Sequence, residues 1–169
     1  MPLLTITTED PRADDVRRLL ARHHALMLEH SPPEGVHALD VDGLCDPSVT
    51  FVGGRADGEL LAVGALKRLG AAGSGGWGGP GGHAELKSMH VAAGSRGLGL
   101  GRHVLDHLLA LARSEGLARV SLETGSMAAF LPARTLYACV GFRECGPFDD
   151  YQPSPFSTFM TLDLEVGAG

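Results

Sequence analysis

The order of apolar and polar residues along the chain predicts strands and helices that alternate, above all in its second half. Strands are indicated where apolar and polar residues alternate or where apolar residues form short runs. They are predicted over residues 3–7, 49–53, 59–67, 85–91, 119–123, 142–145 and 157–164. Apolar residues that recur every three or four positions predict helices over residues 11–29, 102–115 and 129–140. This alternation indicates an α/β layer fold.

Turn residues set the expected limits of these elements, and two segments stay ambiguous. Gly116 is expected to end the central helix, since glycine is common just past a helix C-terminus. Residues 37–44 form either a short helix or a loop. The glycine-rich stretch over residues 69–82 is either a hairpin tip or a mobile lid whose Trp77 stacks on an acceptor, and the hairpin tip is favoured.

A glycine-rich turn joins the strand over residues 85–91 to the central helix. In order, the turn contains Arg96, Gly97, Leu98, Gly99, Leu100, Gly101 and Arg102. A helix N-terminus leaves backbone N–H groups unpaired and carries the positive end of the helix dipole. Glycines let that backbone approach a phosphate closely, and arginines add charge-assisted bonds. The turn therefore predicts an anion site.

The spacing of the glycines narrows the choice of phosphate ligand. A dinucleotide fingerprint, G-x-G-x-x-G, fails because its third glycine would fall on Arg102. A P-loop requires a lysine directly after its last glycine, and none follows Gly101. Arg96, Gly99 and Gly101 do match the pattern Arg-x-x-Gly-x-Gly. With the AELKSMHV strand before it and the LY…GF segment after it, this pattern resembles the Gcn5-related N-acetyltransferases (GNAT).

The likeness continues through the C-terminal half. SLETGS at residues 121–126, PARTLY at 132–137 and GFRECGPF at 141–148 are similar to the YsnE-like branch of the same family. This resemblance implies one N-acetyltransferase domain over residues 1–169. It also implies a mixed central sheet of about six to seven strands with helices on both faces, as in the α+β folds. Acetyl-coenzyme A is the expected cosubstrate.

The resemblance also assigns the coenzyme contacts. In the family, the turn holds the pyrophosphate, and the strand before it splays from its neighbour and pairs with the pantetheine arm. Carried over, this implies main-chain contacts from Met89 and Val91, which lie two residues apart on one side of the strand. His90 alternates away from them, so packing on the sheet is its competing interpretation. The expected coenzyme-binding residues are Met89, His90, Val91, Arg96, Gly97, Leu98, Gly99, Leu100, Gly101, Arg102 and Tyr137.

Acetyl transfer requires a neutral amine and a protonated leaving thiol. A lysine-like amine has a pKa of about 10.4, so only about one molecule in 2,000 is free base at pH 7. A nearby carboxylate can remove the proton. Glu85 matches the position of such a glutamate in several family members, and Glu123 on the neighbouring strand is the second candidate. Tyr137 matches the family tyrosine that can protonate the thiolate, although tyrosines in such helices often serve only as core residues.

One departure from the family pattern leaves other functions open. The family often has an asparagine seven residues before the tyrosine, and this chain has Phe130 there. The chain is therefore expected to be an acetyltransferase for the amine of a small molecule, with direct transfer in a ternary complex. The alternatives are a catalytically silent sensor or interaction module that binds coenzyme A, and a protein that binds a nucleotide or phosphate-sugar.

Composition and charge limit which kinds of partner the chain is expected to have. The chain has 169 residues, 44% of them hydrophobic, and a formal net charge of −6, which argues against general nucleic-acid binding. No apolar run approaches the roughly 20 residues of a membrane span, and the N-terminus does not read as a signal peptide.

Three cysteines without a C-x-x-C pair fit a reduced, cytoplasmic protein. His103 and His107 lack a third ligand, so no metal is expected. The last strand, over residues 157–164, is expected to pair with a second copy in a homodimer.

Overall fold

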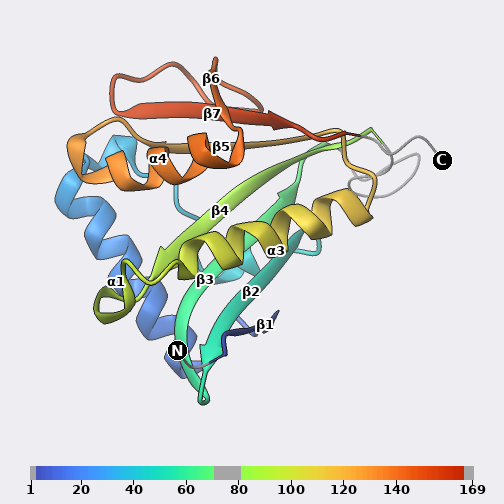
Figure 1. The fold of residues 1–169 in the computed structure, drawn as a ribbon. Helices are drawn as coiled ribbons and strands as arrows, with labels where there is room; N and C mark the ends of the chain where they lie inside the picture. The colour runs from blue at the N-terminus through green and yellow to red at the C-terminus, as the bar shows by residue number, and fades with distance from the viewer. Residues whose placement is uncertain (1–2, 71–80, 166–169) are drawn as a thin grey trace.

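One mixed sheet of seven strands organises the computed structural model, which describes residues 3–70 and 81–165 (Figure 1). The strands lie in the order β1-β2-β3-β4-β5-β7-β6. Only β4 and β5 are parallel neighbours, and every other neighbouring pair is antiparallel. The strand bounds are β1 Thr5–Thr8, β2 Val49–Ala56, β3 Glu59–Arg68, β4 His83–Val91, β5 Arg119–Gly125, β6 Arg143–Cys145 and β7 Ser157–Asp163.

Helices cover both faces of this sheet. The helices are α1 Asp14–His30, α2 Val41–Leu44, α3 Leu100–Ser114 and α4 Leu131–Val140, with 3-10 turns at Pro33–Gly35, Ala93–Ser95 and Ala128–Phe130. Leu105 and Leu108 of α3 belong to the larger buried cluster, against which α4 also packs. Val16 and Leu19 of α1 form the second cluster with Phe51 of β2. The expected mixed sheet with helices on both faces is confirmed.

Several boundaries differ from the sequence-based expectation. Helix α1 begins at Asp14 instead of residue 11, because Ala13 has extended backbone angles and serves as the N-cap. Within the ambiguous residues 37–44, only Val41–Leu44 are helical, and the Asp40 side chain caps them by accepting from the Gly43 N–H. Gly116 ends α3 as expected, with φ +74°. The lid hypothesis for Trp77 lies outside the described residues.

A β-bulge interrupts β4 and turns its side chains. Ala65 of β3 pairs with Lys87, but the next pair joins Val63 to His90, so Gly64 alone faces Ser88 and Met89. Ser88 has φ +56°, a left-handed conformation that few residues with side chains adopt. The extra residue puts Met89 on the α3 side of the sheet and His90 against α1. His90 therefore points away from Met89, as its alternation predicted.

Strands β4 and β5 separate just before the bulge. Their parallel register runs from His83 and Arg119 to Leu86 and Leu122 and then ends. Strand β5 continues to Gly125 while it pairs with β7 on its other side. The edge of β4 that faces β5 is consequently without a strand partner from Lys87 to Val91, among the residues that the structure describes.

The last strand is an inner strand of the sheet. Strand β7 pairs with β5 along its whole length and with β6 from Phe159 to Thr161. A partner copy that paired with this strand would have to displace β6. The homodimer stays a prediction, and the strand expected to form its interface is already paired on both sides over these residues.

Gly64 lies where side chains of the bulge and of α3 leave little space. A Cβ atom there would lie 2.6 Å from Met89 Sδ and 2.8 Å from Val104 Cγ1. We expect Gly64→Ala to cost on the order of 1–3 kcal/mol through overpacking, which lowers Tm by several degrees. The same change at Gly146, where a Cβ would meet nothing within 4 Å, is the matched control. Thermal unfolding measures both, and equal Tm values for the two variants would contradict this account.

Candidate active site

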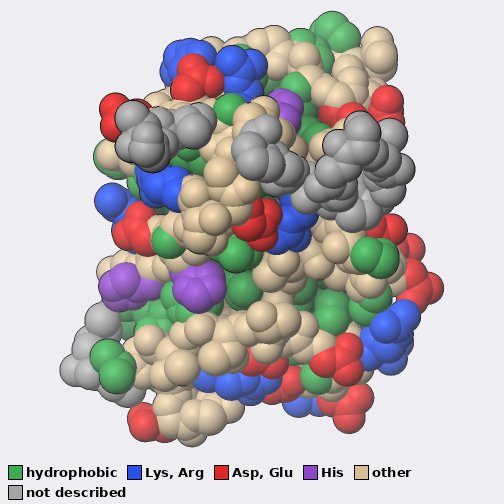
Figure 2. Space-filling view, turned by 90° about the vertical axis from the view of Figure 1, so that its right-hand side faces the viewer, with side chains coloured by type: hydrophobic (Ala, Val, Ile, Leu, Met, Phe, Trp, Pro, Cys, Tyr) green, Lys and Arg blue, Asp and Glu red, His purple; other side chains and the backbone are tan. Residues whose placement is uncertain are grey.

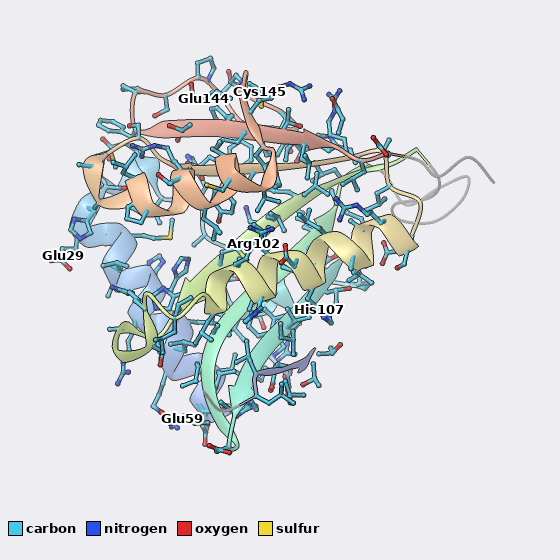
Figure 3. All side chains as sticks on the ribbon, viewed as in Figure 1. Glu29, Glu59, Arg102, His107, Glu144 and Cys145 are labelled. Carbon is cyan, nitrogen blue, oxygen red and sulfur yellow. The ribbon has the colours of Figure 1, made fainter. Side chains whose placement is uncertain are left out.

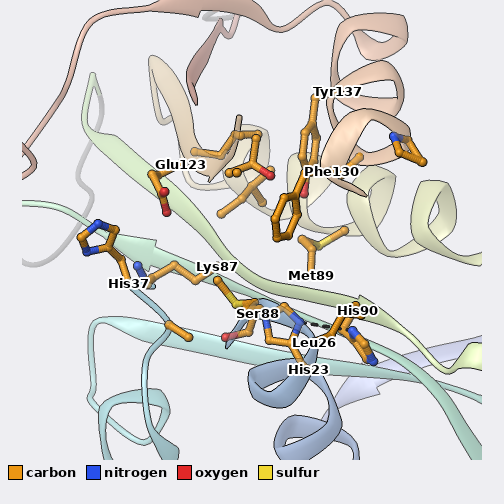
Figure 4. Close-up of a pocket in the computed structure, with 18 of the residues that line it drawn as sticks. His23, Leu26, His37, Lys87, Ser88, Met89, His90, Glu123, Phe130 and Tyr137 are labelled. Carbon is orange, nitrogen blue, oxygen red and sulfur yellow. Dashed lines mark hydrogen bonds between the residues drawn. The ribbon is translucent and has the colours of Figure 1, made fainter. Parts of the chain in front are cut away.

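A pocket with a cavity volume of about 290 Å³ occupies the space between the separated strands (Figure 4). Helix α1, residues 37–38, both strands and the 3-10 turn before α4 contribute to its walls. In Figure 4, Glu123, His37 and Lys87 lie toward one end, whereas Tyr137 and Met89 lie toward the other. Far-separated parts of the chain therefore meet where β4 and β5 diverge.

A second pocket, of about 420 Å³, lies over the glycine turn and joins the first. The two share Met89, His90 and Tyr137 among their lining residues. In the turn, Gly97 and Gly99 both have φ +78°, and Gly99 is the N-cap of α3. Glycine suits these left-handed angles, and the first turn of a helix leaves its N–H groups available to an anion.

The two arginines that flank the turn have different partners. Arg96 Nε donates to the Val91 carbonyl at 3.3 Å. Arg102 lies on α3 (Figure 3). It forms an i, i+4 ion pair with Asp106 at 2.9 Å. Both side chains also line the second pocket, so both are within reach of a ligand held at the turn.

The structure brings almost all the expected coenzyme-binding residues to one pocket. The residues of that set that line it are Met89, His90, Val91, Arg96, Gly97, Gly99, Leu100, Gly101, Arg102 and Tyr137. Leu98 is the member absent from the lining, and its side chain is 49% exposed. Their binding role stays a prediction, but the expected residues share one continuous surface.

Glu85 is buried and already hydrogen-bonded. Its Oε1 atom accepts from Tyr151 Oη at 2.5 Å and from Lys87 Nζ at 3.0 Å. Lys87 Nζ also donates to Tyr151 Oη at 2.9 Å, which closes a ring of three groups. Glu85 lines the first pocket, but its carboxylate is already engaged by both donors.

Glu123 lines the same pocket with fewer partners. Its Oε1 atom accepts from Ser157 Oγ at 2.8 Å. Burial raises the pKa of Glu123, while the Ser157 hydrogen bond and then the nearby His37 and Lys87 act to lower it, and Glu85 acts to raise it. The raised pKa makes Glu123 a stronger proton acceptor than an ordinary glutamate, as active-site carboxylates often are.

Tyr137 is buried at the junction of the two pockets. Its ring packs edge-on against Phe142, with the centroids 5.8 Å apart. Burial raises the pKa of Tyr137, so the phenol keeps its proton. In Figure 4 the hydroxyl points toward the pocket, where it can donate a hydrogen bond.

A histidine pair, with His90 buried and His23 half-buried, joins α1 to β4 beside the pocket. His23 Nδ1 lies 3.2 Å from His90 Nδ1, shown as the dashed line in Figure 4. Burial, then the neighbouring His24, lowers the pKa of His23 to about 4. Burial, then His23 and Arg96, lowers the pKa of His90 to about 3. Both rings are therefore neutral at pH 7, and one donates a hydrogen bond to the other.

Phe130, which stands at the family's asparagine position, lies over the end of β5. A Cβ atom at Gly125 would come within 2.1 Å of the Phe130 ring, so only glycine leaves room for that ring. Phe130 also lines the first pocket, where it offers an apolar surface and no hydrogen-bond donor. The expected coenzyme contact of an asparagine is thus replaced by an aromatic wall.

Neither a metal cluster nor a membrane span is found among the described residues. No group of three or more His, Cys, Asp or Glu side chains is placed to hold a metal ion within residues 3–70 and 81–165. His103 and His107 are exposed on α3. In the same part of the chain, no helix is long and apolar enough to cross a membrane. Figure 2 shows acidic and basic side chains interspersed over one face of the molecule.

Sequence reasoning missed four residues that shape the pocket. Lys87 and Tyr151 hold Glu85, and His23 and His37 come from α1 and the segment after it. Lys87 and Tyr151 are 64 residues apart, so no local spacing could connect them. The available signal for Tyr151 was its place three residues after the GFRECGPF segment, within the part of the chain that is similar to the YsnE-like branch.

Comparisons with known proteins agree with this geometry. Residues 16–142 match the acetyltransferase (GNAT) family. The chain is 40% identical to the N-acetyltransferase YsnE of Bacillus subtilis, over 94% of this chain and 99% of the relative. It is also 40% identical to the N-acetyltransferase YedL of Escherichia coli, over 96% of each chain.

A solved structure shares the fold. A Klebsiella pneumoniae protein assigned as an acyl-CoA N-acyltransferase superimposes with a TM-score of 0.73 at 27% identity, over 96% of this chain and 98% of that one. The resemblance to the YsnE-like branch is confirmed, as is the expected enzyme class, an acyltransferase. The chain belongs to the GNAT acetyltransferase family.

Proposed function

We propose that the protein transfers the acetyl group of acetyl-coenzyme A to the amine of a small molecule, directly within a ternary complex. The observation that carries the proposal is the pair of joined pockets. One lies over the glycine turn, and the other contains a carboxylate with a raised pKa and a buried tyrosine. The acyl-CoA N-acyltransferase assignment of the Klebsiella structure supports the same cosubstrate.

The residues around the turn suit coenzyme A. The open N–H groups at the start of α3, together with Arg96 and Arg102, offer donors to a pyrophosphate. The edge of β4 at Met89 and Val91 has no strand partner on the β5 side, so its main chain is available to the amide groups of a pantetheine arm. Acetyl-coenzyme A supplies an acetyl group that is already activated as a thioester.

Glu123 is the proposed general base. It takes a proton from the acceptor ammonium, directly or through one water, and the neutral nitrogen then attacks the thioester carbon. Glu85 is the second candidate, but its carboxylate is engaged by Lys87 and Tyr151. A backbone N–H of β4 stabilises the charge that develops on the thioester oxygen.

Tyr137 is proposed to assist the leaving sulfur. The bond between carbon and sulfur breaks, and the sulfur leaves as a thiolate whose thiol pKa is near 8.5. Since burial raises the pKa of Tyr137, the phenol holds its proton and stabilises the thiolate by a hydrogen bond. After attack the nitrogen still carries one proton more than the amide product, and this second proton passes through water to the thiolate. The proton on Glu123 is released to water.

Gly101 tests the coenzyme pocket. A Cβ atom there would lie 3.5 Å from Leu136 and 3.6 Å from Val91, at ordinary contact distance, so a longer side chain would extend into the pocket. We expect Gly101→Leu to weaken coenzyme A binding at least roughly tenfold, about 1.4 kcal/mol, without loss of the fold. Gly94→Leu, at a position with nothing within 4 Å and outside both linings, is the control. Calorimetric titration with coenzyme A that gave one affinity for both variants would count against the site.

Glu123→Gln tests the base. We expect kcat at neutral pH to fall by roughly 10²–10⁴-fold, with coenzyme affinity unchanged. The wild-type rate should fall on the acid side through the raised pKa of Glu123, since the base acts only when ionised. The pH profile of the variant should lack this acid limb. Its kcat should recover as the pH approaches the pKa of the acceptor amine, because more of the amine is then already neutral. Glu85→Gln should lose far less activity, and the opposite order of losses would assign the base to Glu85.

Tyr137→Phe separates the leaving-group step from deprotonation of the amine. The ring keeps its packing against Phe142, so the fold and coenzyme affinity should survive. We expect kcat to fall by roughly 10²-fold, at the lower end of the range for a proton donor. A higher pH should not restore the rate, because the missing proton is the one offered to sulfur. A wild-type rate in this variant would leave Tyr137 as a core residue only.

Phe130 supports a second candidate function. Because it replaces a residue that often contacts the coenzyme in this family, a catalytically silent sensor that binds coenzyme A is the second candidate function. The two are separated by thiol release from acetyl-coenzyme A in the presence of small amines. Turnover with any acceptor removes the silent alternative, and coenzyme binding without turnover across amines and amino acids favours it.

A further inference from the structure

Three polar groups at the Glu123 end of the first pocket bind one another, and two of them carry opposite charges. Glu85, Lys87 and Tyr151 form the closed ring of hydrogen bonds described above. The side chains of Glu85 and Lys87 are only 3% and 8% exposed. A buried cation and a buried anion in contact are costly to separate, so neither is free to bind a ligand ion.

The third member is fixed by an aromatic cluster. Tyr151 lies in the segment between β6 and β7, and its ring packs against Phe148, Phe159 and His37 with centroid distances of 5.2, 5.4 and 5.3 Å. Burial, and then the adjacent Glu85, raises the pKa of Tyr151, so its hydroxyl stays protonated and donates to Glu85. The segment between the two strands is therefore held over β4 by a neutral group.

The remaining charge at this end of the pocket is negative. Glu123 faces His37, Lys87, Glu85 and Tyr151 from the surrounding elements. Glu85 and Lys87 form an ion pair with each other, and Tyr151 stays protonated. Among these described residues, Glu123 is the carboxylate that forms no ion pair. Its hydrogen-bond donor, the Ser157 hydroxyl, is uncharged.

Groups farther along the pocket do not change this balance. His23 and His90 are neutral, as their lowered pKa values require. Arg96 lines both pockets, and at the coenzyme end it contacts the Val91 carbonyl and would face a pyrophosphate. Leu26, Met27 and Phe130 add apolar walls. An amine with an apolar body fits this surface. At the Glu123 end, the lysine among the described lining residues is Lys87, and Glu85 already pairs with it.

We propose that Glu85 sets acceptor specificity by neutralising Lys87, so that the pocket takes amines with an apolar body and no carboxylate in place of amino acids. This inference rests on the proposed function and names its substrate class. The ammonium pairs with Glu123, and a carboxylate on the carbon that carries the amine would lie near that same negative charge, which is unfavourable.

The test compares each amino acid with the amine that lacks its carboxylate. The probes are phenethylamine against phenylalanine and pentylamine against norleucine, titrated by calorimetry into the protein saturated with coenzyme A. We expect each amine to bind at least roughly tenfold more tightly than its amino acid, since like charges placed close together cost more than 1 kcal/mol. Equal affinities, tighter binding of the amino acids, or binding of neither would overturn the proposal.

Variants of the ring test its charge. Glu85→Gln leaves Lys87 uncompensated, so the preference for the amine should fall by roughly tenfold, and the acid limb of kcat/KM should move to lower pH as Lys87 lowers the pKa of Glu123. Tyr151→Phe removes a hydrogen bond to the same carboxylate without changing any charge, and it should keep the wild-type preference. Lys87→Met removes the cation and should keep or increase the preference. Loss of the preference in Lys87→Met would overturn the proposal even if Glu85→Gln failed to fold.

Thiol release from acetyl-coenzyme A, measured with the same four acceptors, distinguishes this inference from the proposed function. If the amines bind more tightly but no acceptor releases thiol, the proposed function fails and the specificity stands. If thiol is released faster with phenylalanine than with phenethylamine, the proposed function stands and the specificity is wrong.

Discussion

The end of pairing between β4 and β5, at Leu86 and Leu122, is the constraint on which the site depends. Two parallel strands that part inside a sheet leave main-chain N–H and C=O groups without partners, and such groups are costly to bury. The structure stabilises the opening from three directions. The bulge at Ser88 turns β4, α1 braces it through the histidine pair, and Tyr151 anchors the segment between β6 and β7 to it. The opening between the two strands is therefore supported by contacts from several other elements of the fold.

The opening also affects the pKa of a carboxylate that lies within it. A carboxylate placed there loses water, and its pKa rises unless a cation or several donors offset the loss. Glu123 accepts one neutral hydrogen bond, from Ser157, and burial raises its pKa. The carboxylate of Glu85 instead accepts from Lys87 and Tyr151. Two glutamates on neighbouring strands, within one pocket, thus acquire different chemistry from their partners alone. The uncompensated one is the one suited to exchange protons.

The sequence predicted the elements and the turn better than it predicted the partners in the pocket. The period of apolar residues placed α3 and most strands, because burial on one face imposes that period directly. The glycines of the turn were visible because positive φ angles demand them. The bulge at Ser88 left no comparable mark, since serine is an unusual residue for φ +56°. The family pattern put Glu85 ahead of Glu123 as the base, and no local spacing indicated that Lys87 and Tyr151 would engage it.

The contact between Gly125 and Phe130 has a consequence for how this pocket varies between related chains. The ring occupies the space that a side chain on Gly125 would need, so the two positions share one volume. A larger residue at the end of β5 would force the ring out, and a small polar residue in place of Phe130 would leave the space above Gly125 empty. Substitutions at these two sites should therefore be accepted together more readily than singly, and the polarity of the pocket wall would change in one coupled step.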